Sequence, residues 1–131
     1  MKKSISFLLI LTMILSMLCI VPAAADGDEK QSGDFSYRIK RNGTAVITGY
    51  NFPASAKNLS IAVPITIDGY PVTEIGEEAF SVSYDNREQY QNVSIYLPDG
   101  ITSIGNFAFR GLDITELNIP DSVEEIGYGI F

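Results

Sequence analysis

The segment Ile101-Thr-Ser-Ile104-Gly105-Asn-Phe-Ala108-Phe109 recurs twice more in this chain with the same pattern of apolar residues. The other two copies are Val72-Thr-Glu-Ile75-Gly76-Glu-Glu-Ala79-Phe80 and Val123-Glu-Glu-Ile126-Gly127-Tyr-Gly-Ile130-Phe131. Each copy begins with an apolar residue and has a second one three positions later, followed directly by glycine. A small or apolar residue and a phenylalanine end it. Three agreeing copies predict a repeat architecture, in which stacked units bury together the side chains that no unit can bury alone.

A short alternating run that ends in proline precedes each copy. The three runs are Leu59-Ser-Ile61-Ala-Val63-Pro64, Val93-Ser-Ile95-Tyr-Leu97-Pro98 and Leu117-Asn-Ile119-Pro120. Alternation at period two indicates a strand with one buried face, and proline suits the end of a strand because it has no N–H group to donate. The prolines lie 34 and then 22 residues apart. The basic unit is therefore about 22 residues, within the range of leucine-rich repeats. The additional residues of the first, longer interval lie in segments 65–71 and 81–91.

The glycine and the phenylalanine of each copy carry further expectations. Gly76, Gly105 and Gly127 should either adopt backbone angles that are closed to other residues or let the next unit approach closely. The four residues that lead to each phenylalanine suit a single helical turn, which would swing the ring inward. We therefore expect Phe80 and Phe109 to be buried and stacked about one unit apart.

The motif Ile-Gly-x-x-Ala-Phe, with its upstream proline and the segment Ile67-Asp-Gly-Tyr-Pro-Val-Thr73, resembles the BspA-like class of leucine-rich repeats of bacterial surface and secreted proteins. The resemblance covers residues 57–131. Residues 35–50 resemble the N-terminal segment of such proteins, and the Asn42-Gly43 pair between two alternating runs is a strong hairpin signal. The resemblance implies a mainly β fold with short helical turns. It would be a leucine-rich-repeat solenoid of about three coils, preceded by an N-terminal β-hairpin cap over residues 35–56.

Three features depart from the pattern of the family. Ile130 stands where the family has alanine, and Ile114 opens the third strand one residue earlier than Leu59 and Val93 open theirs. The chain stops at Phe131, where further coils or a cap would normally follow. We therefore expect either a C-terminally truncated part of a longer repeat protein or self-association through an open apolar edge. This edge comprises Leu117, Ile119, Val123, Ile126 and Phe131.

The first 25 residues have the pattern of a secretory signal peptide. Lys2 and Lys3 supply positive charge, residues 7–21 form an uncharged apolar stretch, and Ala23-Ala24-Ala25 provides the small residues of a cleavage site. The alternative is a membrane anchor, but the stretch is shorter than the roughly 20 residues of a spanning helix. We expect secretion or display at the cell surface, with no membrane contact after cleavage. Residues 26–34 contain no apolar residue and predict a disordered spacer.

Composition excludes several classes of function. The chain contains no histidine, and its single cysteine, Cys19, lies within the apolar stretch of the leader. The chain after the leader therefore has neither residue. Serine–histidine and cysteine–histidine nucleophile pairs are therefore impossible, the commonest metal ligand is missing, and the fold cannot depend on disulfide bonds. All 16 acidic residues follow the leader, whereas two of the nine basic ones lie within it, so the net charge after the leader is about −9. Such a field repels nucleic acid and anionic lipid.

The outward-facing residues of the three predicted strands would line the concave face of the sheet, where repeat proteins of this kind bind. Tyr96 is the best single anchor, because its side chain is large, rigid and able to form hydrogen bonds. The alternative is that these residues only solvate one face of the sheet. The candidate binding residues are Ser60, Ala62, Ser94, Tyr96, Glu116 and Asn118.

The polar segment 81–91 is either a binding loop on a rigid scaffold or a tolerated insertion. Its oxygen-bearing side chains could bind Ca²⁺, but their spacing matches no known calcium loop and a basic residue intrudes among them. Two adjacent acidic pairs, Glu77-Glu78 and Glu124-Glu125, suggest the paired carboxylates of a glycosidase or only a solvated turn. We expect no metal and no cofactor. The oxygen-bearing residues are Asp85, Asn86 and Glu88.

The sequence therefore predicts a secreted or cell-surface module that binds another protein and has no catalytic activity. The resemblance implies adhesion to, or recognition of, a host, matrix or neighbouring-cell protein. The alternative is a structural repeat spacer that holds a separate functional or anchoring domain. An enzyme would need convergent polar groups in a pocket, and no such set is visible in the sequence.

Overall fold

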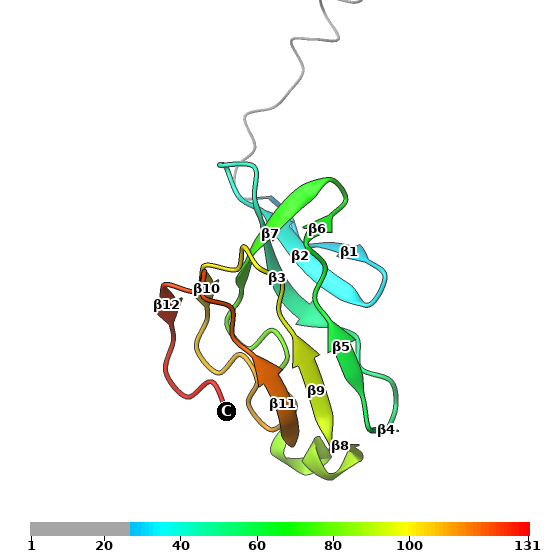
Figure 1. Cartoon of the computed structure of the whole chain (residues 1–131). Coiled ribbons are helices and arrows are strands. Elements are labelled where there is room, and N and C mark those ends of the chain that lie inside the picture. Colours follow the sequence, from blue (N-terminus) through cyan, green and yellow to red (C-terminus); the bar gives the residue numbers. More distant parts are fainter. Residues whose placement is uncertain (1–26) are drawn as a thin grey trace, which may run out of the picture.

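The computed structural model describes residues 27–131. The predicted signal peptide over residues 1–25 lies outside the described residues. The described part is mainly β, and its strands form one seven-stranded, one three-stranded and one two-stranded sheet. Figure 1 shows the strands stacked side by side, from the N-terminal hairpin toward the C-terminal strand. No helix within residues 27–131 is long and apolar enough to cross a membrane.

The N-terminal end of the stack is an antiparallel hairpin with a third strand on its edge. β2 (Phe35–Ile39) pairs with β3 (Ala45–Tyr50), as the intervening Asn-Gly pair predicts. β1 (Lys30–Ser32) pairs antiparallel with β2. The prediction of a disordered spacer over residues 26–34 is therefore wrong for residues 30–32. These polar residues are ordered by backbone pairing with the edge of β2, which requires no apolar side chain.

Successive repeats add strands to two parallel sheets. In the first sheet, β7 (Tyr70–Ile75) pairs with β10 (Ser103–Ile104), and β10 pairs with β12 (Glu125–Ile126). In the second, β9 (Val93–Tyr96) lies between β5 (Ser60–Ala62) and β11 (Ile114–Asn118), as Figure 1 shows. β3 pairs in parallel with β7 and so joins the cap to the first repeat. The mainly β fold with parallel strands is confirmed, whereas the solenoid and its number of coils stay predictions.

A polar corner precedes the second sheet. β4 (Ala56–Lys57) and β8 (Tyr90–Gln91) pair in parallel, and an asparagine follows each strand. Asn58 and Asn92 have φ values of +61° and +55°, which asparagine tolerates better than most residues. The Asn92 Nδ2 group donates a hydrogen bond to Asn58 Oδ1 over 3.1 Å. The two corners are therefore aligned along the stack.

A hairpin that the sequence pattern did not predict lies just before the first repeat copy. β6 (Thr66–Ile67) pairs antiparallel with the start of β7 around the two-residue turn Asp68-Gly69. Both turn residues have positive φ, +48° and +86°. Positive φ at both central positions is type I′ geometry, for which Asp-Gly is a preferred sequence. The excess residues of segment 65–71 are thus accounted for by this hairpin.

Asp68 ties this hairpin to the N-terminal cap. Its carboxylate accepts one hydrogen bond from the hydroxyl of the buried Tyr37 and another from Ser32 Oγ, the second over 3.1 Å. The hydrogen bond to Asp68, together with burial, raises the pKa of Tyr37 to about 12. The hydrogen bonds from Tyr37 and Ser32 lower the pKa of Asp68. The ionised carboxylate is therefore the form that the fold favours.

A column of aromatic rings forms the centre of the core. Phe80 and Phe109 are fully buried, and their rings stack with centroids 5.7 Å apart and an interplanar angle of 25°. This confirms the predicted stack. Phe35 and Tyr50 of the cap continue the column beyond Phe80, with centroid distances of 6.4 and 5.8 Å. The fully buried isoleucines around the column are Ile47, Ile61, Ile75, Ile95, Ile101 and Ile104.

The repeated glycines lie where the backbone of one repeat meets that of the next. Gly76, Gly105 and Gly127 have no positive φ, so the expectation of special backbone angles is wrong and that of close approach is confirmed. A Cβ atom on Gly105 would lie 2.5 Å from the amide nitrogen of Glu77. A Cβ atom on Gly127 would lie 2.5 Å from that of Asn106. Any side chain at these positions would force neighbouring repeats apart.

The predicted helical turn between the glycine and the phenylalanine does not form. Glu78 and Phe107, the equivalent residues of two copies, have positive φ of +56° and +55°. The Glu78 and Phe80 amides donate hydrogen bonds to the carbonyls of Asn106 and Ala108, over 3.0 and 2.8 Å. In a helix, amides bond along their own segment, whereas here the next repeat offers each one a carbonyl. The helix η1 (Tyr84–Gln89), a 3-10 helix, lies instead in the polar segment 81–91.

A β-bulge absorbs the one-residue offset that the sequence shows at Ile114. Ile114 lies opposite Val93, but Glu116 lies opposite Ser94, so Thr115 is the extra residue of β11. A bulge places two residues of one strand opposite one residue of its partner. The remainder of β11 therefore continues in phase with β9.

The last repeat leaves part of its predicted apolar edge uncovered. Ile119, Ile126 and Phe131 are 41%, 52% and 70% exposed. Two other residues of this edge, Leu117 and Val123, pack partly against the core, as does Ile130. Self-association through this edge stays a prediction.

Removal of the Phe109 ring should destabilise the protein strongly, because the ring is buried between neighbouring repeats. We expect Phe109→Ala to lower the free energy of unfolding by about 3–5 kcal/mol. The matched control is Phe131→Ala at the equivalent position of the third copy, where the exposed ring should contribute less than about 0.5 kcal/mol. Chemical denaturation measures both values, and equal losses would contradict the buried stack.

A single methyl group on Gly105 should also destabilise the protein. Gly105→Ala places a Cβ atom against the Glu77 backbone and should cost about 1–3 kcal/mol or more. The control is Gly49→Ala, because Gly49 also lacks positive φ and its Cβ atom would meet only the Ser36 side chain, with Cβ at 3.5 Å and Oγ at 3.6 Å, both ordinary contacts. Urea denaturation should show little loss for Gly49→Ala. A comparable loss in both variants would show that close approach is not the reason for the glycine.

The bonds to Asp68 should make stability depend on pH in the acid range. Because the folded-state pKa of Asp68 is lowered, its contribution is fully present above the unfolded-state value of about 3.9 and is lost as pH falls through the lower folded value. Asp68→Asn keeps a turn-forming Asn-Gly pair but removes the charge. The stability difference between the parent protein and Asp68→Asn, measured by thermal unfolding, should therefore shrink below about pH 4.

The control is Asp99→Asn, which also converts an Asp-Gly pair into Asn-Gly. Asp68 accepts hydrogen bonds from the side chains of Ser32 and Tyr37, whereas within residues 27–131 the Asp99 carboxylate accepts no such side-chain hydrogen bond. Its difference from the parent protein should show a weaker pH dependence. If Asp68→Asn and Asp99→Asn change with pH to the same extent, the Tyr37 and Ser32 hydrogen bonds do not contribute to stability.

Candidate binding face

The six candidate binding residues come together on one face of the second sheet. Strand alternation directs Ile61 and Ile95 into the core and their neighbours outward. The parallel register aligns the outward residues in two rows that cross the three strands. The first row is Ser60, Ser94 and Glu116, and the second is Ala62, Tyr96 and Asn118.

Tyr96 projects from the middle strand of this face. Its side chain is 40% exposed, and its hydroxyl donates a hydrogen bond to Glu116 Oε2 over 2.8 Å. This hydrogen bond, with a smaller contribution from desolvation, raises the pKa of Tyr96. The phenol therefore stays protonated to a higher pH than that of an ordinary tyrosine. The bond holds the ring over the junction between β9 and β11, which reduces the entropy that a partner would otherwise have to remove on binding.

Asn118 has a structural role that the sequence did not indicate. Its side-chain oxygen accepts a hydrogen bond from the Leu97 amide, and its Nδ2 group donates one to the Leu97 carbonyl, each over 3.0 Å. The side chain thereby extends the pairing of β11 with β9 by one peptide group. Because these bonds occupy the amide, Asn118 can contribute to binding mainly through its position and shape.

The face as a whole is small-residue surface around one aromatic ring. Ser60 and Ala62 are exposed and Ser94 is half-buried, so their short side chains leave the Tyr96 ring as the main projection. Within the described residues, no group of three or more acidic, histidine or cysteine side chains could hold a metal ion. The arrangement presents one aromatic side chain among short ones, as the anchor of a protein interface would.

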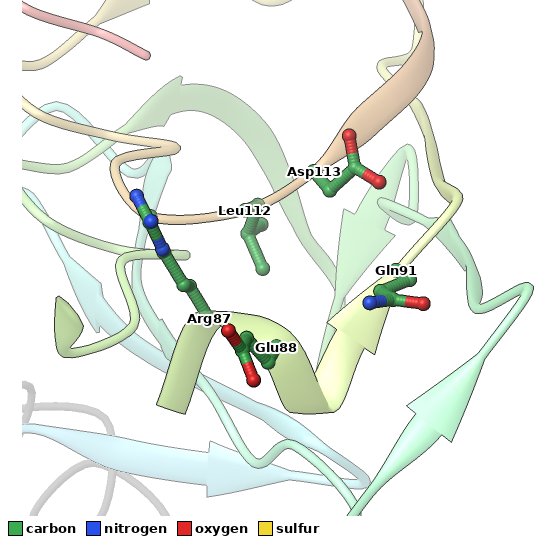
Figure 2. Close-up of a pocket in the computed structure, with 6 residues that line it drawn as sticks. Arg87, Glu88, Gln91, Leu112 and Asp113 are labelled. Carbon is green, nitrogen blue, oxygen red and sulfur yellow. The ribbon is translucent and has the colours of Figure 1, made fainter. Parts of the chain in front are cut away.

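A pocket of about 390 Å³ lies elsewhere, beside η1. Figure 2 shows Leu112 in the middle of this pocket, the Arg87 guanidinium on one side, and the side chains of Gln91 and Asp113 on the other. Of the residues considered for Ca²⁺, Asn86 accepts a hydrogen bond through Oδ1 from Gln89 Nε2 over 3.3 Å within η1. The pocket is therefore a mixed polar and apolar hollow.

A cluster of aromatic and arginine side chains near this pocket was not predicted from the sequence. Arg87 and Arg110 are the two basic residues that follow Lys57, in a region that contains 12 acidic residues. Two arginines in so acidic a region could have been singled out from the sequence. Nothing in their spacing, however, indicates that they lie on neighbouring turns. The stack of repeats brings them together, since Tyr84 and Arg110 line one hollow of about 280 Å³.

Comparisons with known proteins relate this geometry to a family. The family model described as the BspA type leucine rich repeat region, with 6 copies, matches residues 73–131. No curated protein matches the chain.

Three solved structures share the fold. A leucine-rich repeat protein of T. pallidum is 28% identical, with a TM-score of 0.57 over 76% of this chain. A leucine-rich cell surface protein of Faecalibacterium prausnitzii is 27% identical, with a TM-score of 0.59 over 82%. This chain spans 42% and 28% of the length of these two proteins. A leucine-rich repeat protein of Bacteroides capillosus is 23% identical, with a TM-score of 0.55, and the match covers 78% of this chain and 89% of that one.

Proposed function

Because residues 73–131 match the model of the BspA type leucine rich repeat region, we propose that this chain is a protein-interaction module of the bacterial cell surface without catalytic activity. The repeats supply a rigid stack, and the outer face of β5, β9 and β11 supplies the contact surface. The partner we propose is a host, matrix or neighbouring-cell protein. Because this chain spans less than half of the length of two of the similar structures, the activity of a whole protein of that length is likewise part of this proposal.

The observation that carries the proposal is the ordered position of Tyr96. A half-exposed aromatic ring, held by Glu116 and surrounded by short side chains, has the composition and placement of an interface anchor. Tyrosine is enriched among the few residues that dominate binding energy in protein interfaces. The short neighbours Ser60, Ala62 and Ser94 allow a partner to approach the ring from the side without displacing bulky groups.

Two further observations support a surface location. The first 25 residues have the pattern of a secretory signal peptide, and one of the similar structures is described as a cell surface protein. The net charge after the leader, about −9, would oppose binding to nucleic acid or anionic lipid. Adhesion through protein contacts is the function that these properties favour. The other candidate function is that of a structural spacer. The side-chain amide of Asn118 is compatible with it, because its hydrogen bonds join β11 to the Leu97 peptide group.

Loss of the Tyr96 ring should weaken partner binding without unfolding the protein. We expect Tyr96→Ala to reduce the affinity for a matrix or cell-surface protein by at least about tenfold, as for other aromatic anchors. Surface plasmon resonance with a panel of purified extracellular-matrix proteins measures the affinities. The control is Tyr70→Ala, because Tyr70 is 37% exposed and lies on the β6–β7 hairpin, outside the face.

Thermal unfolding of both variants separates loss of binding from loss of the fold. The proposal is supported if Tyr96→Ala binds poorly, melts close to the parent protein, and Tyr70→Ala binds normally. Equal weakening in both variants would place the contact elsewhere. The spacer is favoured if no protein of the panel binds. A second sign of a spacer would be that a domain fused to the intact repeats keeps a constant distance from the other end of the stack.

A further inference from the structure

A second surface of the molecule carries a chain of stacked aromatic and arginine side chains, here called the aromatic–arginine cluster. The Arg87 guanidinium lies over the Tyr84 ring, 4.2 Å from its centroid. The Arg110 guanidinium lies over the Phe107 ring at 5.0 Å, and Phe107 contacts Tyr128 edge-on with centroids 5.0 Å apart. Tyr84 and Arg110 line one hollow, which joins the two halves of the cluster.

The cluster stands on the turns that follow the repeated glycines, not on the binding face of the second sheet. The Val82 amide donates a hydrogen bond to the Arg110 carbonyl over 2.9 Å, and the Phe107 amide donates one to the Tyr128 carbonyl over 3.1 Å. These bonds run between repeats and fix the backbone at Phe107, Arg110 and Tyr128. Tyr84 and Arg87 come from η1, in the polar segment that interrupts the regular repeat spacing.

The exposure of the cluster is unusual for aromatic side chains. Tyr84 is 73% and Tyr128 66% exposed, although apolar ring surface is costly to leave in water. Tyrosine and arginine are the residue types that concentrate in the energetic centres of protein interfaces. Stacking on the rings also restrains the guanidinium groups, so less side-chain entropy is lost when a partner binds them.

The charges of the cluster are incompletely matched within the molecule. Arg110 Nη2 forms an ion pair with Glu78 Oε1 over 2.9 Å. In the part of the chain that the structure describes, Arg87 forms no ion pair, despite the 12 acidic residues that follow Lys57. Figure 2 shows its guanidinium extending away from the carboxylates of Glu88 and Asp113. A carboxylate from another molecule is the natural complement of this guanidinium, because the two can pair bidentately.

We propose that the aromatic–arginine cluster is a second docking surface, which binds a protein segment that presents a single Asp or Glu side chain beside apolar side chains. The partner's carboxylate would pair with Arg87, and its apolar groups would cover Tyr84 and Leu112. A run of acidic residues is disfavoured, because Asp85, Glu88 and Asp113 lie close by and would repel it. An isolated carboxylate among apolar groups fits both the cation and the rings.

A protein partner suits this surface better than a sugar acid. Small-ligand sites are concave and bury most of the ligand, whereas the Tyr84 and Tyr128 side chains are more than half exposed. A nucleic acid would be repelled by the net negative charge of the chain. The proposal goes beyond the function assigned to the second sheet, because the two surfaces share no residue.

The test uses ¹⁵N-labelled protein produced from the full 131-residue sequence and three small probes. They are acetyl-Leu-Glu-Phe-amide, its neutral glutamine analogue and sodium glucuronate. Addition of the glutamate peptide should shift backbone amide signals at residues 84–87, 107–111 and 128, with a dissociation constant of about 1 mM for so small a ligand. The glutamine analogue and glucuronate should bind about tenfold more weakly or not at all.

Arg87→Gln should weaken binding of the glutamate peptide about tenfold. The control is Arg38→Gln, which removes the same charge from an exposed residue of β2 and should leave the affinity within about twofold. Arg110→Gln provides a second test of the cluster, and thermal unfolding verifies that each variant is folded. Tyr96→Ala should leave peptide binding unchanged, so this proposal and that for the second sheet succeed or fail separately.

Several results would overturn the proposal. Shifts confined to the second sheet, or no shifts, would show that the cluster does not bind such a segment. Equal affinity for the glutamate and glutamine peptides would remove the role of Arg87, and equal weakening by Arg87→Gln and Arg38→Gln would reduce the effect to net charge. Tighter binding of glucuronate than of the peptide would assign the surface to acidic sugars instead.

Discussion

The close approach of backbones at the repeated glycines is the constraint on which the rest of the structure depends. A Cβ atom at Gly76 would lie 2.9 Å from the Ile47 carbonyl oxygen, and one at Gly105 or Gly127 would lie 2.5 Å from an amide of the preceding repeat. These distances set how closely one repeat sits on another. Gly76 lies where the first repeat meets the N-terminal hairpin, and Gly105 and Gly127 lie where one repeat meets the next. The same close backbone contact therefore recurs along the whole stack.

The other features of the core follow from that spacing. With the repeats this close, the amides after each glycine reach carbonyls of the next repeat, as at Glu78 and Phe80. The rings of Phe80 and Phe109 then stack at 5.7 Å. Burial of apolar surface stabilises the stack, but the glycines and the backbone hydrogen bonds decide its geometry. This is why a helical turn, locally reasonable after each glycine, gives way to a turn with positive φ at Glu78 and Phe107.

A stack of this kind presents side chains in rows, because equivalent positions of successive repeats lie side by side. On the second sheet this produces the rows around Tyr96. The aromatic–arginine cluster is not such a row, because it combines turn residues of two repeats with Tyr84 and Arg87 of η1. The two surfaces differ in chemistry: the first surrounds one phenol with short side chains and the carboxylate of Glu116, while the second combines aromatic rings with two arginine cations. Both rest on backbone that is hydrogen-bonded between repeats, which favours rigid presentation over adaptation.

The sequence by itself determined the repeat, the strands of the second sheet, the buried rings of Phe80 and Phe109 and the common face of the six candidate residues, because period-two alternation and repeated spacing are local properties of the chain. It also showed the one-residue offset at Ile114, although only the pairing of β11 with β9 identified it as a bulge at Thr115. The tertiary structure alone decided features that arise between repeats. The order of β1 depends on the free edge of β2, the duty of Asn118 on the Leu97 peptide, and the bond of Asp68 on Tyr37. The meeting of Tyr84 with Arg110 likewise depends on how neighbouring turns stack. These contacts join residues 20 or more positions apart, or depend on unpaired backbone, and neither kind leaves a periodic mark in the sequence.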